Sequence, residues 1–316
     1  PSRACLLTGR YGIRNGMYSA SGKRRVLFPD SEGGLPSTEI TIAKHLQRNG
    51  YQTACVGKWH LGHLKEYLPN SHGFDYYFGI PYSNDMDKNT PLEYYKAASE
   101  PKIDYFNVPM MKDANIIERP VDQTTITKRY TEEVVRFIAE HKQKPFFIYL
   151  AHSMPHVPLF ASRDFKGKSE RGLYGDVIEE IDWSVGQILN TLKKEGLDKN
   201  TVVIFTSDNG PWSMFNENGG SAGPLFGAKG TGYEGGQRVP AIFWGPGNVK
   251  PGLISGIGST LDLFPTISKF AGVALPKNIA YDGYDISPVL KSNSQSPRKE
   301  MIFYHDDKIF AARKGD

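Results

Sequence analysis

The side chains of this sequence that could take part in catalysis or bind an anion or a metal ion lie in four short segments. Three of them directly follow apolar stretches that we expect to be strands, and the fourth lies in a glycine-rich loop. They are residues 57–62 with Lys58 and His60, residues 152–156 with His156, residues 207–210 with Asp208 and Asn209, and residues 227–230 with Lys229. Open α/β sheets bind ligands beyond the carboxyl ends of their strands, so the first three segments are predicted to share one crevice.

Each segment taken alone also has a purely structural interpretation. Lys58 and Lys229 could be solvated loop charges, and His156, which has prolines on both sides, could be a rigid loop residue. Asp208 and Asn209 precede a glycine, and Asn-Gly is also a favourable turn sequence because both residues tolerate positive φ. For Glu234 and Arg238, which precede the next expected strand, the structural interpretation is preferred: we expect them to pair.

The residue types become more informative when the segments are combined. Two lysines, an arginine and two histidines beside an aspartate and an asparagine indicate a site for an oxyanion next to a hard cation. A tetrahedral anionic ester needs positive charge around its non-bridging oxygens and a proton donor for its leaving oxygen. The combined set contains both.

Alternating strands and helices must position these side chains, and the alternation predicts a layered α/β fold. We expect strands at residues 53–56, 146–150, 202–206 and 239–244, and helices at 40–48, 130–141, 174–194 and 261–270. The continuous apolar runs at 146–150 and 202–206 are typical of strands buried on both faces. The first helix is predicted to begin near Ser37 or Thr38.

Two stretches interrupt this alternation. Residues 81–127 are polar and proline-rich, and residues 211–232 are glycine-rich, so we expect them to form functional rims or lids. From about Ser292 the chain becomes polar and then offers one more strand at 301–304. We therefore predict a catalytic domain over residues 1–291 and the start of a small C-terminal subdomain over residues 292–316.

The composition argues against several classes of protein. Mean hydropathy is −0.44, and the longest apolar stretches are far too short for a transmembrane segment. The formal net charge is only +4 and the basic residues are scattered, which argues against a nucleic-acid-binding surface. Cys5 and Cys55 are the two cysteines and form at most one disulfide. Cys5 stands beside two leucines, which favours a small buried apolar residue over a nucleophile.

Eight ordered motifs extend over nearly the whole chain. It opens with Pro-Ser-Arg-x-x-Leu-x-Thr-Gly-Arg and continues with Gly-Lys-Trp-His-Leu-Gly at 57–62, Gly-Ile-Pro-Tyr-Ser at 79–83, Pro-His-x-Pro at 155–158, Ser-Asp-Asn-Gly at 207–210, Gly-x-Lys at 227–229, Glu-Gly-Gly-x-Arg at 234–238 and Asp-Leu-Phe-Pro-Thr at 262–266. In type and order these motifs resemble those of the type I sulfatases, in the branch of arylsulfatase A and N-acetylgalactosamine-6-sulfatase. The resemblance implies an alkaline-phosphatase-like fold, a large mixed sheet flanked by helices.

The resemblance also implies roles for individual residues. Arg3 corresponds to the arginine that holds a formylglycine nucleophile, and Lys58 and Lys229 correspond to the lysines that bind the sulfate oxygens. His60 corresponds to the base that releases sulfate, and His156 to the histidine that protonates the departing alcohol. The implied reaction is a double displacement: a hydroxyl of hydrated formylglycine attacks sulfur, the alcohol leaves, and sulfate is expelled in a second step.

The remaining implied parts of the site include a metal ion. Ser83 corresponds to a polar position lining the substrate site, and Asp208 and Asn209 correspond to two ligands of a single calcium ion. In the family the formylglycine arises from a cysteine two positions before the proline that is Pro1 here. We therefore expect the nucleophile and the remaining calcium ligands upstream of this sequence, and no normal turnover by the 316-residue chain alone.

The implied substrate is an aryl or carbohydrate sulfate, either a sulfated small molecule or a glycan. The implied maturation partner is a formylglycine-generating enzyme. The sequence contains no Asn-x-Ser/Thr sequon, which favours a protein exported to a bacterial periplasm or the exterior over a lysosomal one. Tyr82, Asn84, Asp85 and Trp212 could line a sugar subsite or simply pack the loops.

Two alternatives stay open at this stage. Phosphodiesterases and phosphonate monoester hydrolases share the implied fold and can carry serine, threonine or formylglycine as nucleophile. A non-catalytic relative could use the same cationic pocket to bind sulfated glycans. The residue two positions before Pro1 distinguishes these possibilities.

Overall fold

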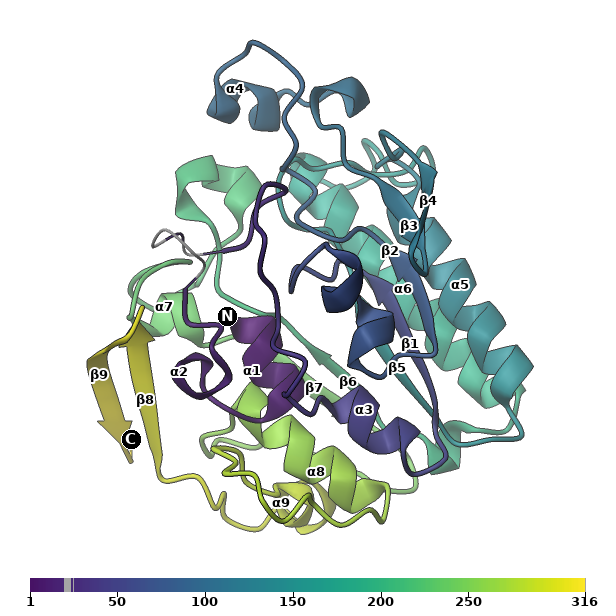
Figure 1. The fold of residues 1–316 in the computed structure, drawn as a ribbon, viewed down its shortest axis with the longest axis vertical. Helices are drawn as coiled ribbons and strands as arrows, with labels where there is room; N and C mark the ends of the chain where they lie inside the picture. The colour runs from purple at the N-terminus through teal and green to yellow at the C-terminus, as the bar shows by residue number, and fades with distance from the viewer. Residues whose placement is uncertain (20–23, 25, 316) are drawn as a thin grey trace.

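The computed structural model of the protein describes residues 1–19, 24 and 26–315 and is built around a mixed β-sheet (Figure 1). Its strands are β1 (Gln52–Gly57), β2 (Tyr76–Gly79), β3 (Met110–Lys112), β4 (Asn115–Glu118) and β5 (Phe146–Ala151), in the order β4-β3-β2-β1-β5. β1 is parallel to β2 and β5, whereas β3 is antiparallel to both of its neighbours. The parallel strands therefore end together at one edge of the sheet, where the polar segments follow them.

Two further strand pairs complete the β-structure. β6 (Val203–Thr206) pairs antiparallel with β7 (Ala241–Trp244), and β8 (Glu300–His305) forms a hairpin with β9 (Lys308–Lys314). Among the described residues β5 and β6 are not paired with each other, and both strands line a cavity of about 2460 Å³. This cavity contacts every residue of the two strands.

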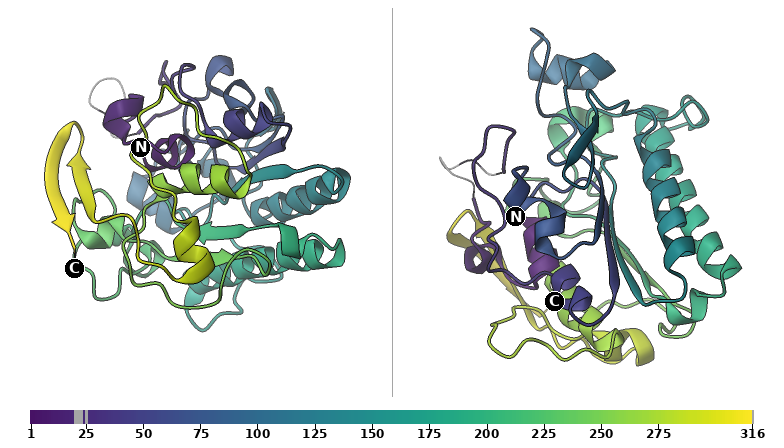
Figure 2. Two further views of the ribbon diagram at one scale, coloured as in Figure 1. Left: turned by 90° about the horizontal axis from the view of Figure 1, so that it is seen from below. Right: turned by 45° about the vertical axis from the view of Figure 1, so that its right-hand side comes forward.

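Helices cover both faces of the sheet (Figure 2). α5 (Ile126–His141) and α6 (Gly172–Lys194) pack against each other on one face, and α1 (Ser2–Thr8), α3 (Ile42–Gln47) and α8 (Leu263–Phe270) lie on the other. The apolar stripes of these helices face inward, as the burial of Val134, Phe137 and Ile138 on α5 shows. The short helices are α2 (Gly12–Asn15), α4 (Tyr94–Ser99), α7 (Glu234–Gln237) and α9 (Ser287–Ser292).

The predicted strands and helices are all present, but the burial of two strands, the start of one helix and the structure of residues 81–127 differ from the prediction. The strands predicted to be buried on both faces, β5 and β6, are mostly half-buried, because both border the cavity. α3 begins after Thr41, not near Ser37 or Thr38, because the Thr41 hydroxyl accepts the backbone N–H of Lys44 and caps the helix. Residues 81–127, expected as a loop, contain α4, β3 and β4.

The C-terminal hairpin is joined to the rest of the molecule by a buried ion pair and by surface contacts. Arg298, immediately before β8, donates to both carboxylate oxygens of Asp262 at 2.5 and 3.0 Å. On the surface, Arg313 of β9 pairs with Glu234 at 2.9 Å. Both cysteines are free thiols, and burial raises the pKa of each. Within the described residues, no helix is both long and apolar enough to cross a membrane.

Candidate active site

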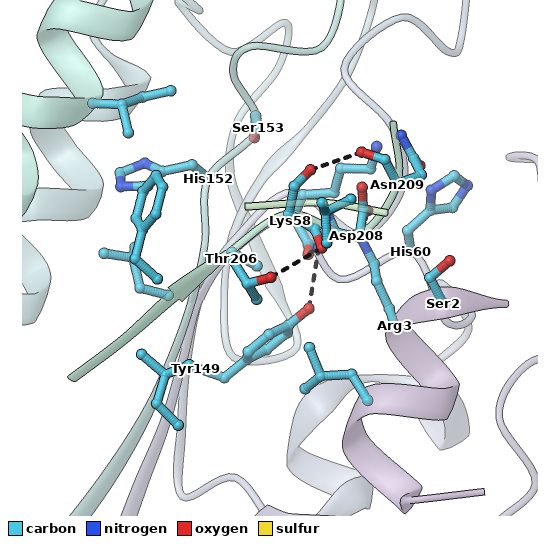
Figure 3. Close-up of a pocket in the computed structure, with 18 of the residues that line it drawn as sticks. Ser2, Arg3, Lys58, His60, Tyr149, His152, Ser153, Thr206, Asp208 and Asn209 are labelled. Atoms are coloured by element: carbon cyan, nitrogen blue, oxygen red, sulfur yellow. Dashed lines mark hydrogen bonds and ion pairs between the residues drawn. The ribbon is translucent and has the colours of Figure 1, made fainter. Parts of the chain in front are cut away.

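The cavity extends to the carboxyl ends of β1, β5 and β6 and brings the predicted polar segments together there. Lys58, His60, His156, Asp208 and Lys229 all line it, as do Arg3, Ser83 and Asn209. The close-up shows Arg3 reaching from α1 towards Lys58 and Asp208, with Asn209 and His60 on the same side (Figure 3). The predicted site residues therefore share one cavity, although they come from six different segments of the chain.

Glycines let the strand ends approach closely enough to fix Lys58. Gly57 has φ of +112°, and a Cβ at this position would lie 2.0 Å from the carbonyl oxygen of Ala151. A Cβ at Gly79 would lie 1.8 Å from the carbonyl oxygen of Gly57, so both positions require glycine. The backbone N–H of Lys58 then donates to Ala151 at 2.7 Å.

The Lys58 side chain is the most buried cation of the site, with 4% of its surface exposed. Its Nζ donates to the Ser83 hydroxyl at 3.0 Å, so Ser83 lies beside Lys58 in the cavity wall. Burial, reinforced by the charge of Arg3, lowers the pKa of Lys58 to about 7. An anion bound beside Lys58 would favour its charged form.

Arg3 connects the ends of β1 and β6. Its guanidinium donates to the Lys58 carbonyl oxygen at 2.6 Å, to Asp208 Oδ2 at 2.9 Å and to the Tyr149 hydroxyl at 3.4 Å. Burial alone would raise the pKa of Asp208, but Arg3, Lys58 and Lys229 outweigh it and hold that pKa well below its usual range. Asp208 is therefore a carboxylate. Pro1, which precedes α1, also borders the cavity.

His60 is held in one tautomer by its backbone partner. Its Nε2 lies 2.9 Å from the Leu27 carbonyl oxygen, and because a carbonyl only accepts, Nε2 carries the hydrogen. Burial, followed by the charge of Lys58, lowers the pKa of His60 well below its ordinary value. Neutral His60 thus has its lone pair on Nδ1, and this atom is the one able to accept a proton. The residue has φ of +60°, an uncommon conformation for a non-glycine.

His156 and Lys229 contact each other directly. His156 Nδ1 lies 2.6 Å from the Val157 carbonyl oxygen and so carries a hydrogen, which leaves Nε2 to accept from Lys229 Nζ at 2.8 Å. Lys229 Nζ also lies 4.4 Å from the centre of the Trp212 ring. Burial is the largest cause of the lowered pKa of both His156 and Lys229.

Asp208 and Asn209 supply oxygen atoms of the kind that calcium prefers. Among the described residues, Asp208 Oδ1 and Asn209 Oδ1 accept no hydrogen bond, since Arg3 binds the other Asp208 oxygen and Asn209 donates to Gly210 through its Nδ2. However, the described part of the chain has no group of three or more His, Cys, Asp or Glu residues that could hold a metal ion. These two residues alone are too few to hold a calcium ion, which takes about 6–8 oxygen ligands, so the calcium site stays a prediction.

Other residues differ in how they relate to the predicted site. His152, which is in the same predicted segment as His156, lies apart from the charged cluster and contacts Ser184 of α6 at 3.3 Å (Figure 3). Glu234 and Arg238 form the expected structural pair at 3.4 Å. Tyr149 was missed by the sequence analysis, because within the apolar run of β5 it looks like an ordinary core residue.

Comparisons with known proteins identify what this chain resembles. A family model described as Sulfatase matches residues 1–273. The chain is 40% identical to N-acetylgalactosamine-6-sulfatase of Mus musculus and 39% identical to arylsulfatase A of Homo sapiens; these matches cover all of this chain but only 61% and 64% of the two relatives. The chain thus spans less than two thirds of the length of these relatives.

Solved structures give the same result. The PsFucS1 sulfatase from Pseudoalteromonas sp. aligns with a TM-score of 0.83 and 29% identity over 99% of this chain and 66% of that one. Ps i-CgsB in complex with k-i-k-neocarrahexaose aligns with a TM-score of 0.78 and 31% identity over 96% and 68%. These matches confirm the predicted resemblance and the predicted fold class.

Proposed function

The chain belongs to the sulfatase family, and from that membership we propose that it forms most of the catalytic domain of a sulfuric ester hydrolase. The proposed substrate is an aryl or carbohydrate sulfate monoester. The observation that carries the proposal is the convergence of Arg3, Lys58 and Lys229 on one cavity, beside two histidines with fixed tautomers. Clustered cations of this kind need an anion to offset their repulsion.

Lys58 and Lys229 are the proposed ligands of the non-bridging sulfate oxygens. Lys58 is fixed by Ser83 and by the strand ends, so little rearrangement is required when an anion binds. Lys229 approaches from the opposite loop and is held by Trp212 and His156. Pre-positioned positive groups of this kind stabilise the charge that develops on the sulfuryl oxygens in the transition state.

His156 is the proposed proton donor to the leaving alcohol. Because Val157 fixes the hydrogen on Nδ1, the protonated ring carries its second hydrogen on Nε2, on the side that faces Lys229. The leaving oxygen would therefore lie beside Nε2 and Lys229. His60 is the proposed base that assists sulfate release, and its Nδ1 is the available basic atom because Leu27 holds the hydrogen on Nε2.

The proposal also includes a calcium ion and a formylglycine nucleophile, which the described residues do not contain. Asp208 and Asn209 would hold a calcium ion together with ligands from a segment upstream of Pro1, and the bound ion would offset negative charge on the sulfate. The nucleophile would be a formylglycine two positions before Pro1. The position of Pro1 in the wall of the cavity that Arg3, Lys58 and Asp208 also line supports this, since the residues before it would lie near the charged cluster.

The proposal is tested with the full-length protein, co-expressed with a formylglycine-generating enzyme. We expect a cysteine two positions before Pro1 and release of sulfate from 4-nitrophenyl sulfate that a calcium chelator abolishes. The 316-residue chain, purified in parallel, should release none, because it lacks the nucleophile. The matched control replaces the expected cysteine by alanine, which should remove turnover while sulfate still binds.

The same assay separates the alternatives. Cleavage of a phosphodiester or phosphonate monoester in preference to the sulfate would assign the protein to the phosphohydrolase branch. Binding of a sulfated sugar without cleavage of any ester would identify a glycan-binding protein. Cleavage of sulfated oligosaccharides is the expected result of a subsequent substrate screen, since a structural relative was solved with a neocarrahexaose. We propose export as the location of the protein, and secretion of the full-length product tests it.

A further inference from the structure

Asp85 is a carboxylate in the cavity wall that the proposed mechanism does not use. It follows β2, and only 10% of its side chain is exposed. The Tyr94 hydroxyl donates to Asp85 Oδ2 at 2.5 Å. Asp85 Oδ1 is buried, has no hydrogen-bond partner of normal geometry among the described residues and lies 4.0 Å from His156 Nδ1, and the Ser83 hydroxyl also interacts with the Asp85 carboxylate. Buried carboxylate oxygens without a donor are costly, so this arrangement calls for an explanation.

The charges that face His156 come from four other segments. Lys58 lies at the end of β1 and Lys229 in the glycine-rich loop, and both disfavour a positive charge on the imidazole. Asp208 follows β6 and is engaged by Arg3. Asp85 is the carboxylate that faces the imidazole without a cationic side chain bonded to it. Trp212, whose ring centre is 5.3 Å from that of His156, covers a further side.

We propose that Asp85 is a positioning residue that stabilises the protonated form of His156 and thereby enables it to act as proton donor. Tyr94 orients Asp85 by holding one carboxylate oxygen, so the other faces the imidazole. This inference rests on the proposed role of His156 in sulfate ester hydrolysis. It goes beyond that role by naming the residue on which the charge of the imidazole depends.

In the proposed step, His156 transfers a proton to the leaving oxygen of the sulfate ester. The bond between sulfur and the leaving oxygen breaks, its electron pair stays on that oxygen, and the proton on His156 Nε2 transfers to it. His156 is then neutral, with its remaining hydrogen on Nδ1 and donated to Val157. Asp85 keeps its negative charge throughout, because it interacts electrostatically and exchanges no proton. The direction of the Asp85 pKa agrees with this: burial would raise it, but His156 and Lys58 lower it below the ordinary value.

The first test compares two substrates in full-length Asp85→Asn. 4-Nitrophenyl sulfate has a leaving group that departs without a proton, whereas an alkyl or sugar sulfate needs one. We expect kcat to fall by about 10² on the alkyl or sugar sulfate, which is within the usual contribution of general acid catalysis, and to stay nearly unchanged on the aryl sulfate. Asp85→Glu, which keeps the charge, should restore part of the loss.

Asp87→Asn is the matched control, because Asp87 is on the same segment but pairs with Arg119 and does not face His156. It should leave both activities near the wild-type level. An equal loss on both substrates in Asp85→Asn would show a merely structural role and overturn the proposal. An unchanged rate on the alkyl or sugar sulfate would overturn it as well.

A second measurement does not depend on turnover and separates this proposal from the proposed function. NMR titration of the His156 ring, assigned with a His156→Gln variant, is done in the presence of inorganic sulfate. Loss of the nearby charge in Asp85→Asn should lower the pKa of His156 by about 1–3 units. If wild-type protein cleaves no sulfate ester but this shift occurs, the proposed function fails and the role of Asp85 stands. If the pKa of His156 is unchanged, the role of Asp85 fails.

Discussion

The low pKa of Lys58 predicts that the proposed binding of sulfate depends on pH. Burial and Arg3 lower this pKa to about 7 in the absence of an anion, so Lys58 loses its charge within an accessible pH range. Sulfate binds the charged form. The apparent Kd is therefore constant well below pH 7 and rises tenfold per pH unit well above it. Between pH 6 and pH 9 the affinity should fall by roughly 90-fold.

Isothermal titration calorimetry of the full-length protein with inorganic sulfate measures this directly. In the anion-free protein His60 and His156 are neutral across this range, because burial holds the pKa of each below the ordinary histidine value. At pH 7 about half of the Lys58 side chains must gain a proton on binding, so the measured enthalpy should also vary with the ionisation enthalpy of the buffer.

Lys58→Arg is the matched variant, since arginine stays protonated throughout this pH range. It should still bind sulfate and should lose the decrease in affinity that is centred near pH 7. The reasoning is refuted if wild-type Kd is the same at pH 6 and pH 9, or if Lys58→Arg retains the wild-type pH dependence. Either result would mean that Lys58 stays charged despite its burial.

Three further predictions concern the cation cluster, the metal site and the fold. Lys229→Ala in the full-length enzyme should lower kcat by about 10²–10³, by analogy with the loss of an oxyanion donor, and wild-type turnover would contradict this. Asp208→Ala should lose bound calcium in elemental analysis, and retention of the wild-type content would place the ion elsewhere. Arg298→Ala leaves Asp262 buried without its cation and should destabilise the protein by about 3–5 kcal/mol in urea unfolding. Arg313→Ala removes a partly exposed ion pair at the surface and should cost about 1 kcal/mol or less, and equal losses in these two variants would refute the distinction.

The parts of the site that sequence could predict are those fixed by local order along the chain. Lys58, His60, Asp208 and Asn209 follow strands with clear apolar patterns, and the ends of these strands meet at the cavity, which places the four residues together. Lys229 lies in a loop, and its position was predictable only through the resemblance to a family. The structure brings it to His156 at 2.8 Å.

The parts that sequence did not predict depend on contacts between distant segments. β2, β3 and β4 have three or four residues each, too few for a period-2 pattern to identify them. Asp85 was predicted to line a sugar subsite or simply to pack the loops, and its relation to His156 was not predictable because it arises when the segments after β2 and β5 pack together. Periodicity could not show that β5 and β6 are half-buried, since that depends on the cavity between them.

The arrangement of charges itself favours an anionic ligand in this pocket. Lys58, Lys229 and His156 each have a lowered pKa, with burial as the largest cause. A protein gains no stability from such groups in their charged forms, because desolvation and mutual repulsion both oppose them. The attraction of an anion bound among them offsets both effects, so binding free energy and proton uptake are coupled. A neutral ligand would gain nothing from this coupling, and the pocket therefore selects for negative charge before any contact with the rest of the substrate is made.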